Sequence, residues 1–212
     1  MMHGILILWF FGNFDDGRVA KMENKTYFKR ALTALLAIAI ATFMTASLTA
    51  CGGKDDSTVI KECISQELDQ IKDKNGDEWN ELVDSFNSSV GNGLDQLGID
   101  GNAIITTWLS DFDYSIKDVK IDGDTADAEV SITNKSIIDA LGEWQKETIN
   151  ELSSKASISD DDYKAAGQKL IQKIENSVAK TQDATFTFTK SGNTWTLDEE
   201  SATNELYNCL MS

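Results

Sequence analysis

Residues 113–133 read DYSIKDVKIDGDTADAEVSIT, and this stretch decides the fold. Every second residue near its end is apolar, namely Ala126, Ala128, Val130 and Ile132. A period of two predicts a half-buried β-strand. Asp122-Gly123 is a hairpin-turn signal, so the residues before it are expected to form the partner strand. The apolar phase slips by one residue after Ile116, which predicts a β-bulge near Lys117-Asp118 that bends the sheet.

A second hairpin is predicted near the C-terminus, where Ser191-Gly192-Asn193 separates two alternating segments, 184–188 and 195–197. Two long helices are expected between the hairpins, over 136–152 and 160–180, because each segment has a single apolar stripe. Ser159 precedes three aspartates and is therefore expected to cap the second helix.

Helical spacing of apolar residues also predicts three helices before the first strand, over 60–71, 79–86 and 103–109. The glycine-containing segment 91–101 is expected to be a loop, and a short helix over 201–210 closes the chain. These elements predict an α+β fold. Its N-terminal helices pack on a bent antiparallel sheet of two hairpins, with a long helical hairpin inserted between the two.

The N-terminal region has the order of a secretory signal. Lys25, Lys29 and Arg30 precede the apolar run 31–44, which ends in the small-residue stretch before Cys51. The strongly apolar part is shorter than the roughly 20 residues that a membrane-spanning helix needs. We therefore expect a signal peptide over 22–50. Residues 1–21 are interpreted as an extension from a misassigned start, with Met22 as the true start. A tether over 51–57 and a single domain over 58–212 follow, and Ser57 is expected to cap the first helix.

Leu48-Thr49-Ala50-Cys51 resembles the lipobox of bacterial lipoproteins. The resemblance implies that a signal peptidase recognises Leu48, Thr49 and Ala50, and that Cys51 becomes the acylated N-terminus. One acyl chain holds a protein only marginally, whereas two chains give a stable anchor. A diacylglyceryl group on Cys51 would supply two. The expected location is the extracytoplasmic face of the cell membrane, held by lipid.

The part after residue 50 has 162 residues, enough for one domain, and carries 14 lysines against 32 carboxylates. Its net charge of −18 argues against nucleic-acid binding, because such a field repels phosphate backbones. This part also contains neither Arg nor His. Histidine-based catalytic triads, histidine-containing zinc sites and arginine clamps for phosphate are therefore excluded, and no cofactor is expected.

Two further cysteines, Cys63 and Cys209, follow Cys51. In an oxidising compartment they are a candidate disulfide that would join the two ends of the domain. The alternative is two separately buried thiols, each packed as a small apolar residue.

Three other patterns in the sequence resemble functional sites. Asp111 and Asp113 beside Tyr114 could transfer a proton in a pocket, although a helix end that enters a strand explains the same residues. The spacing in 118–129 partly matches a calcium loop, but Lys120 occupies a ligand position, so a hairpin turn is favoured. Four tryptophans lie on apolar stripes and are expected in the core rather than in sugar binding: Trp79, Trp108, Trp144 and Trp195.

The lipobox, the phrase 113–126 and the ending 192–198 with its terminal helix together resemble small bacterial lipoproteins with a cystatin-like or NTF2-like domain. The resemblance implies helices packed into the concave face of the sheet. We expect a non-enzymatic binding or protein-interaction module that holds either a small apolar ligand in the concavity or a neighbouring membrane protein. The alternative is an NTF2-like enzyme that uses pocket carboxylates and Tyr114 for proton transfer. A two-lobed solute-binding lipoprotein is disfavoured, because the mature chain makes one domain.

Overall fold

The computed structural model describes residues 55–211. The chain begins with three helices and a short 3₁₀ turn: α3 (Asp56–Lys72), α4 (Asp77–Leu97), α5 (Gly101–Trp108) and η2 (Leu109–Asp111). Two strands and two helices follow: β1 (Asp113–Asp122), β2 (Thr125–Lys135), α6 (Ile137–Ser153) and α7 (Asp160–Glu175). The described part ends with β3 (Ala179–Ser191), β4 (Thr194–Leu197) and α8 (Glu199–Met211). The fold is α+β, as the sequence predicts.

The four strands form one antiparallel sheet in the order β1-β2-β3-β4. Gly123 lies in the turn between β1 and β2 with a φ of 59°, and Gly192 lies in the turn between β3 and β4 with a φ of 63°. Glycine adopts this left-handed conformation without a steric penalty, which suits it to both turns. The register of β1 against β2 shifts between Ile116 and Asp118, which confirms the predicted bulge.

One face of the sheet is buried and the other is polar. The buried face consists of alternate residues of β2 and β3: Ala126, Ala128, Val130, Ile132, Ala184, Phe186 and Phe188. This face packs against α3, which contacts β1, and α8, which contacts β3 and β2. Full burial of a side chain such as Phe188 contributes about 1.5–3 kcal/mol. On the polar face Thr187 Oγ1 donates a hydrogen bond to Asp127 Oδ1 at 3.0 Å.

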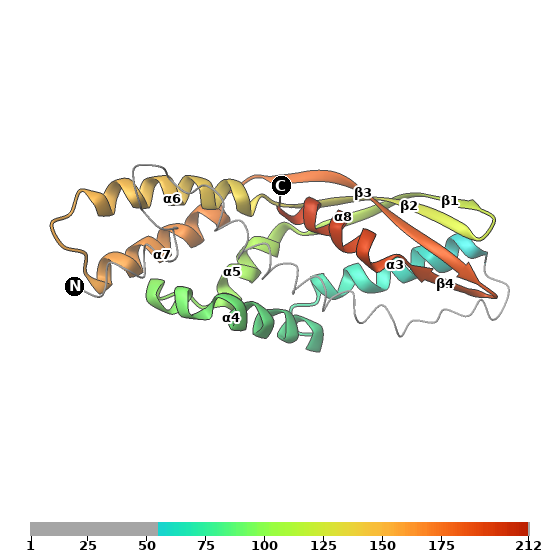
Figure 1. The fold of residues 1–212 in the computed structure, drawn as a ribbon, viewed down its shortest axis with the longest axis horizontal. Helices are drawn as coiled ribbons and strands as arrows, with labels where there is room; N and C mark the ends of the chain where they lie inside the picture. Colours follow the sequence, from blue (N-terminus) through green and yellow to red (C-terminus); the bar gives the residue numbers. More distant parts are fainter. Residues whose placement is uncertain (1–54, 212) are drawn as a thin grey trace.

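Helices α6 and α7 pack against each other beyond the sheet, in the half of the elongated molecule that also holds α4 and α5 (Figure 1). Of the N-terminal helices only α3 contacts the sheet extensively, whereas α4 and α5 pack against α7. The expectation that the N-terminal helices pack on the sheet is therefore wrong for α4, whereas α5 reaches the sheet at its last residue, Trp108, whose indole donates to the Lys135 carbonyl of β2. A Cβ at Gly167 of α7 would overlap the carbonyl oxygen of Leu97, so glycine permits this close approach of α4 and α7.

Three of the differences between predicted and observed boundaries have a clear physical cause. Helix α3 begins at Asp56, inside the expected tether, because the N-cap is Asp55 rather than Ser57 and its side chain accepts a hydrogen bond from the Thr58 amide. Helix α4 continues to Leu97 through the segment expected to be a loop, and it ends at Gly98 in the left-handed conformation. Helix α7 ends at Glu175, because residues 179–183 pair with β2 instead of continuing the helix.

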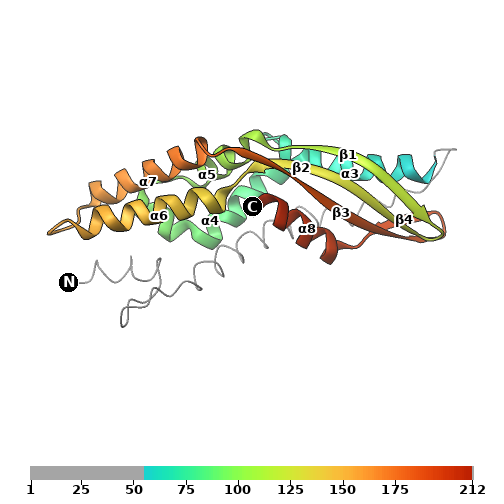
Figure 2. The ribbon, with the colours of Figure 1, turned by 90° about the horizontal axis from the view of Figure 1, so that it is seen from above.

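The turn between β1 and β2 lies beside β3 at one end of the molecule, where the Lys190 amide donates to the Asp124 carbonyl at 2.8 Å. The loop 154–159 between α6 and α7 lies at the opposite end (Figure 2). Within residues 55–211 every helix is too short or too polar to cross a bilayer.

Candidate functional site

A cleft of about 600 Å³ lies between α6, α7 and the start of β3. Its lining is mainly polar and charged: Ser136, Asp139, Ala140, Glu143, Glu147, Lys169, Gln172, Lys173, Asn176, Ser177, Val178 and Lys180. We call this the α6–α7 cleft. Among the described residues Val178 is the most exposed large apolar residue, with 79% of its surface accessible. The cleft therefore combines exposed charges of both signs with one apolar contact.

The lysines of the α6–α7 cleft are paired with carboxylates across it. Lys173 Nζ lies 2.7 Å from Glu147 Oε1 and 3.3 Å from Glu143 Oε2. Lys180 Nζ lies 2.7 Å from Asp139 Oδ2, and this hydrogen bond holds the Asp139 pKa below its usual range. Lys173 has a raised pKa, chiefly because it donates to Glu147. Exposed pairs of this kind contribute only about 0–1 kcal/mol each. A partner with charged side chains could therefore replace them at little cost.

The end of the α6–α7 cleft is fixed by a buried lysine. Lys135 is the last residue of β2, its side chain is only 8% exposed, and its ammonium donates to the carbonyl oxygen of Glu175 at 2.7 Å. A cation at this position satisfies a free carbonyl at the C-terminus of α7 and suits the helix dipole. The next residue, Ser136, caps α6 by accepting from the Asp139 amide at 3.3 Å. Lys135 was not among the predicted site residues, because its only signal in the sequence is a lysine between a strand and a helix cap.

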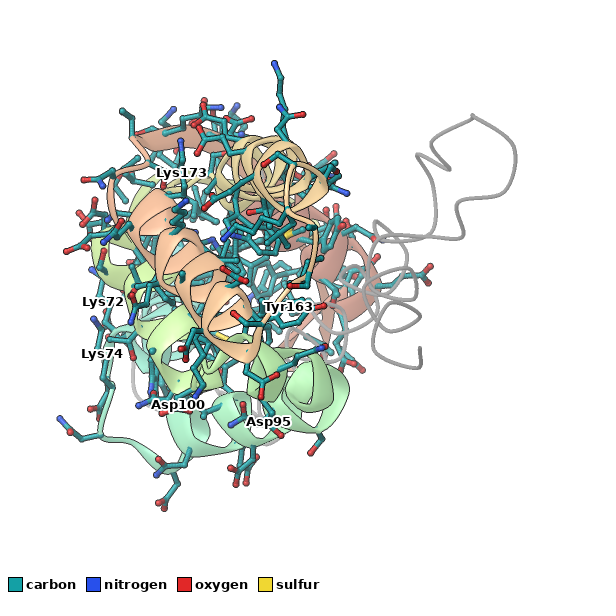
Figure 3. The ribbon with its side chains drawn as sticks, turned by 90° about the vertical axis from the view of Figure 1, so that its left-hand side faces the viewer. Lys72, Lys74, Asp95, Asp100, Tyr163 and Lys173 are labelled. Carbon is teal, nitrogen blue, oxygen red and sulfur yellow. The ribbon has the colours of Figure 1, made fainter. Side chains whose placement is uncertain are left out.

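A second cleft, of about 410 Å³, lies between the end of α4 and the start of α5. It is lined by Asn87, Ser88, Leu94, Asp95, Ile99, Asp100 and Gly101. Asp100 caps α5 by accepting from the Asn102 amide at 3.1 Å. In Figure 3 Lys173 lies at the upper end of α7, and Asp95 and Asp100 lie below that helix. No group of three or more His, Cys, Asp or Glu suited to a metal ion occurs within the described residues.

The residues predicted for proton transfer form a contact between α3 and β1. The Tyr114 hydroxyl donates to Asp69 Oδ1 at 2.9 Å, and Lys72 Nζ lies 2.6 Å from Asp113 Oδ1 and 4.7 Å from the centre of the Tyr114 ring. Burial raises the pKa of Tyr114, whereas the hydrogen bond from Lys72 lowers the pKa of Asp113. These contacts join two elements of the fold and line neither cleft.

Asp111 is separate from this contact. Its Oδ2 lies 3.8 Å from Lys135 Nζ, beside the end of β2. The structure thus brings Asp113 and Tyr114 together with α3 and places Asp111 with another partner. An acid with a raised pKa, which the enzyme alternative requires, is not provided by Asp113.

Cys63 and Cys209 are both buried free thiols in the structure. The candidate disulfide between them is not formed here, and the arrangement matches the alternative of two separate thiols. Burial raises the pKa of each thiol to about 11. The lipid-attachment prediction, at Leu48, Thr49, Ala50 and Cys51, falls outside the described residues, as do the signal peptide and the extension before it.

The four tryptophans are buried, which confirms their predicted place in the core. Three of their indole N–H groups have acceptors. Trp108 donates to the Lys135 carbonyl at 3.1 Å, and Trp144 donates to the Ala166 carbonyl at 2.7 Å. Trp79 donates to Asn102 Oδ1 at 3.4 Å. The hairpin turn at Asp122-Gly123 is also present, which confirms the turn that was favoured over a calcium loop.

Comparison with known proteins leaves the family open. No family model and no curated protein matches the chain. Among solved structures the chain is similar to a "putative lipoprotein", YcdA of Bacillus subtilis, at 18% sequence identity and a TM-score of 0.38. The alignment covers 88% of this chain and 59% of YcdA, so the chain spans about three fifths of the length of that structure.

Proposed function

We propose that this protein is a lipid-anchored lipoprotein on the extracytoplasmic face of the membrane and acts there as a non-enzymatic protein-interaction module. The observation that carries the proposal is the lipobox-like sequence Leu48-Thr49-Ala50-Cys51. The helix cap Asp55 follows Cys51 after only three residues, so an acylated Cys51 would join the folded domain to the membrane directly.

The arrangement of the domain supports binding rather than catalysis. The mature part lacks histidine and arginine, and the Tyr114 hydroxyl is engaged with Asp69 on α3. The apolar face of the sheet packs against α3 and α8, which favours a protein partner over a small apolar ligand in the concavity. We also propose that the domain is cystatin-like or NTF2-like. Helices that pack on one face of an antiparallel sheet support this assignment.

The α6–α7 cleft is the docking surface that we propose, and its partner is a neighbouring membrane protein with a polar, charged segment. The exposed ion pairs of Lys173 and Lys180 could exchange partners with such a segment. Val178 would supply the apolar contact. The net charge of −18 argues against nucleic acid as the partner.

Anchoring is tested by cell fractionation of the full chain and its Cys51→Ala variant. The unmodified chain should sediment with membranes, and Cys51→Ala should be released or remain unprocessed. Cys63→Ala is the matched control, because Cys63 is a buried thiol of the domain and should leave anchoring unchanged. Retention of processed Cys51→Ala in the membrane fraction would contradict the anchor.

Docking is tested by a photo-crosslinking amino acid at Val178 in cells. We expect one discrete adduct with a membrane protein, and a large reduction of that adduct when Lys173→Glu is added. The control position is Ile158, which is 39% exposed in the loop between α6 and α7 and lies outside the lining of the cleft. Equal adducts from both positions, or an adduct that survives Lys173→Glu unchanged, would argue against the cleft.

A further inference from the structure

The position of the first helix residue bears on how the domain stands relative to a membrane. At most about 14 Å of chain separates Cys51 from Asp55, because each residue spans at most ~3.6 Å. A lipid on Cys51 would therefore hold the first turn of α3 close to the bilayer surface. Whatever lies beside that turn in the fold is held close as well.

The two β-turns lie beside the first turn of α3. Lys190 Nζ, next to the β3–β4 turn, is 2.6 Å from Asp56 Oδ2. The Lys190 amide donates to Asp124 of the β1–β2 turn at 2.8 Å. A continuous set of contacts thus joins the start of α3 to both turns.

The loop 154–159 between α6 and α7 lies at the far end of the long axis (Figure 1). The 13 residues of β3 span about 40 Å, and the 16 residues of α7 add about 25 Å beyond the sheet. The two ends of the molecule are therefore separated by much more than the length of the tether.

Charge opposes adsorption of the long side of the domain on the bilayer. The mature part carries a net charge of −18, and anionic head groups repel such a domain. Asp122 and Asp124, at the turn end itself, are also exposed and acidic, so charge alone does not draw this end to the bilayer. The covalent tether is then the main force that sets which end meets the membrane.

We infer that the domain stands on the membrane by its two β-turns, with the loop 154–159 farthest from the bilayer. This inference rests on the proposed lipid anchor at Cys51. It assigns the turn end to the lipid head groups and places the helical half of the molecule, with the α6–α7 cleft, where a partner that projects from the membrane can reach it.

The test uses the full chain, processed in cells, purified with its lipid and reconstituted in phosphatidylcholine vesicles. A single reporter cysteine is introduced by Asn193→Cys at the β3–β4 turn, Thr185→Cys in the middle of β3, or Ile158→Cys at the far loop. All three positions are exposed, whereas Cys63 and Cys209 are buried. Each reporter carries a fluorophore, and an acceptor dye is placed on the lipid head groups.

Energy transfer should be severalfold stronger from position 193 than from position 158, with position 185 between them. Equal transfer at all three positions, or the reverse order, in protein that carries its lipid would overturn the orientation and leave the anchor standing. Protein whose mass shows no acyl group would overturn the anchor and the orientation together. Circular dichroism before reconstitution confirms that each variant is folded.

Discussion

Lys190 Nζ lies 2.6 Å from Asp56 Oδ2, so a residue next to the β3–β4 turn holds the first turn of α3 across 134 positions of sequence. The same ammonium lies 5.2 Å from the centre of the Trp195 ring, which gives it a second favourable contact. The hydrogen bond from Lys190 lowers the pKa of Asp56. The end of the domain nearest Cys51 is thus tied to the sheet.

Replacing Lys190 by Met should loosen the first turn of α3. The amide of Val59, which bonds the Asp55 carbonyl, should exchange its hydrogen severalfold faster, as measured by hydrogen–deuterium exchange. Lys61→Met is the control, because Lys61 is an exposed lysine of the same helix. Equal exchange in Lys190→Met and unmodified protein would show that the pair does not hold the helix.

The same pair predicts a pH dependence. Because the pKa of Asp56 is lowered below its ordinary value of about 3.8, the stabilising contribution of Asp56 is present above that pH and is lost as the pH falls through the folded pKa. The difference in exchange between Lys190→Met and unmodified protein should therefore shrink below about pH 4. A difference that stays constant down to pH 2 would contradict this account of the pair.

Two glycine substitutions should have opposite effects. Gly167→Ala places a methyl group against the Leu97 carbonyl and should destabilise the fold by about 1–3 kcal/mol. Gly142 lies on the exposed face of α6, and a Cβ added there has nothing within 4 Å, so Gly142→Ala should stabilise the fold by about 0.5–1 kcal/mol. Urea unfolding of the two variants measures both changes. Stabilisation by Gly167→Ala would show that α4 and α7 are not in close contact.

The cap of α7 gives a fourth prediction. Ser159 accepts from the Asp162 amide, and Asp162 Oδ2 accepts from the Ser159 amide at 2.8 Å, which together form a capping box. Ser159→Ala should therefore lower the free energy of unfolding by about 1 kcal/mol. Ser157→Ala, in the same exposed loop, is the control and should change it by less than about 0.5 kcal/mol. Equal effects of the two substitutions would show that the Ser159 cap does not stabilise the fold.

The reactivity of Cys63 and Cys209 distinguishes a disulfide between them from two separate buried thiols. Because both are buried and have pKa values raised to about 11, they should react very slowly with a thiol reagent at pH 8 in folded protein. Both should react at once after unfolding without a reductant. A disulfide would instead leave neither free until a reductant is added. The raised pKa values also predict loss of stability as the pH rises from 9 towards 11.

Local patterns in the sequence predicted the elements with strong periodicity. The alternation in 125–133 and the phase slip after Ile116 gave β2 and the bulge in β1, because side chains alternate between the faces of a strand. Ser159 marked the start of α7 for a similar local reason, since the cap is made by residues close in sequence.

Contacts between distant residues could not be predicted in this way. Val178 continues the apolar spacing of α7 but is 79% exposed, because the following residues pair with β2 rather than extend the helix. Helix α4 runs through Gly91 and Gly93, each of which costs about 1 kcal/mol in a helix, because its last turn buries Leu94 and α4 packs on α7. The α6–α7 cleft depends on the same long-range packing.

The mass of the protein extracted from membranes tests the central claim most directly. The account predicts a chain that begins at Cys51, with residues 1–50 removed and a diacylglyceryl group on the sulfur of that cysteine. A chain that retains residues before Cys51 and carries no acyl group would contradict it.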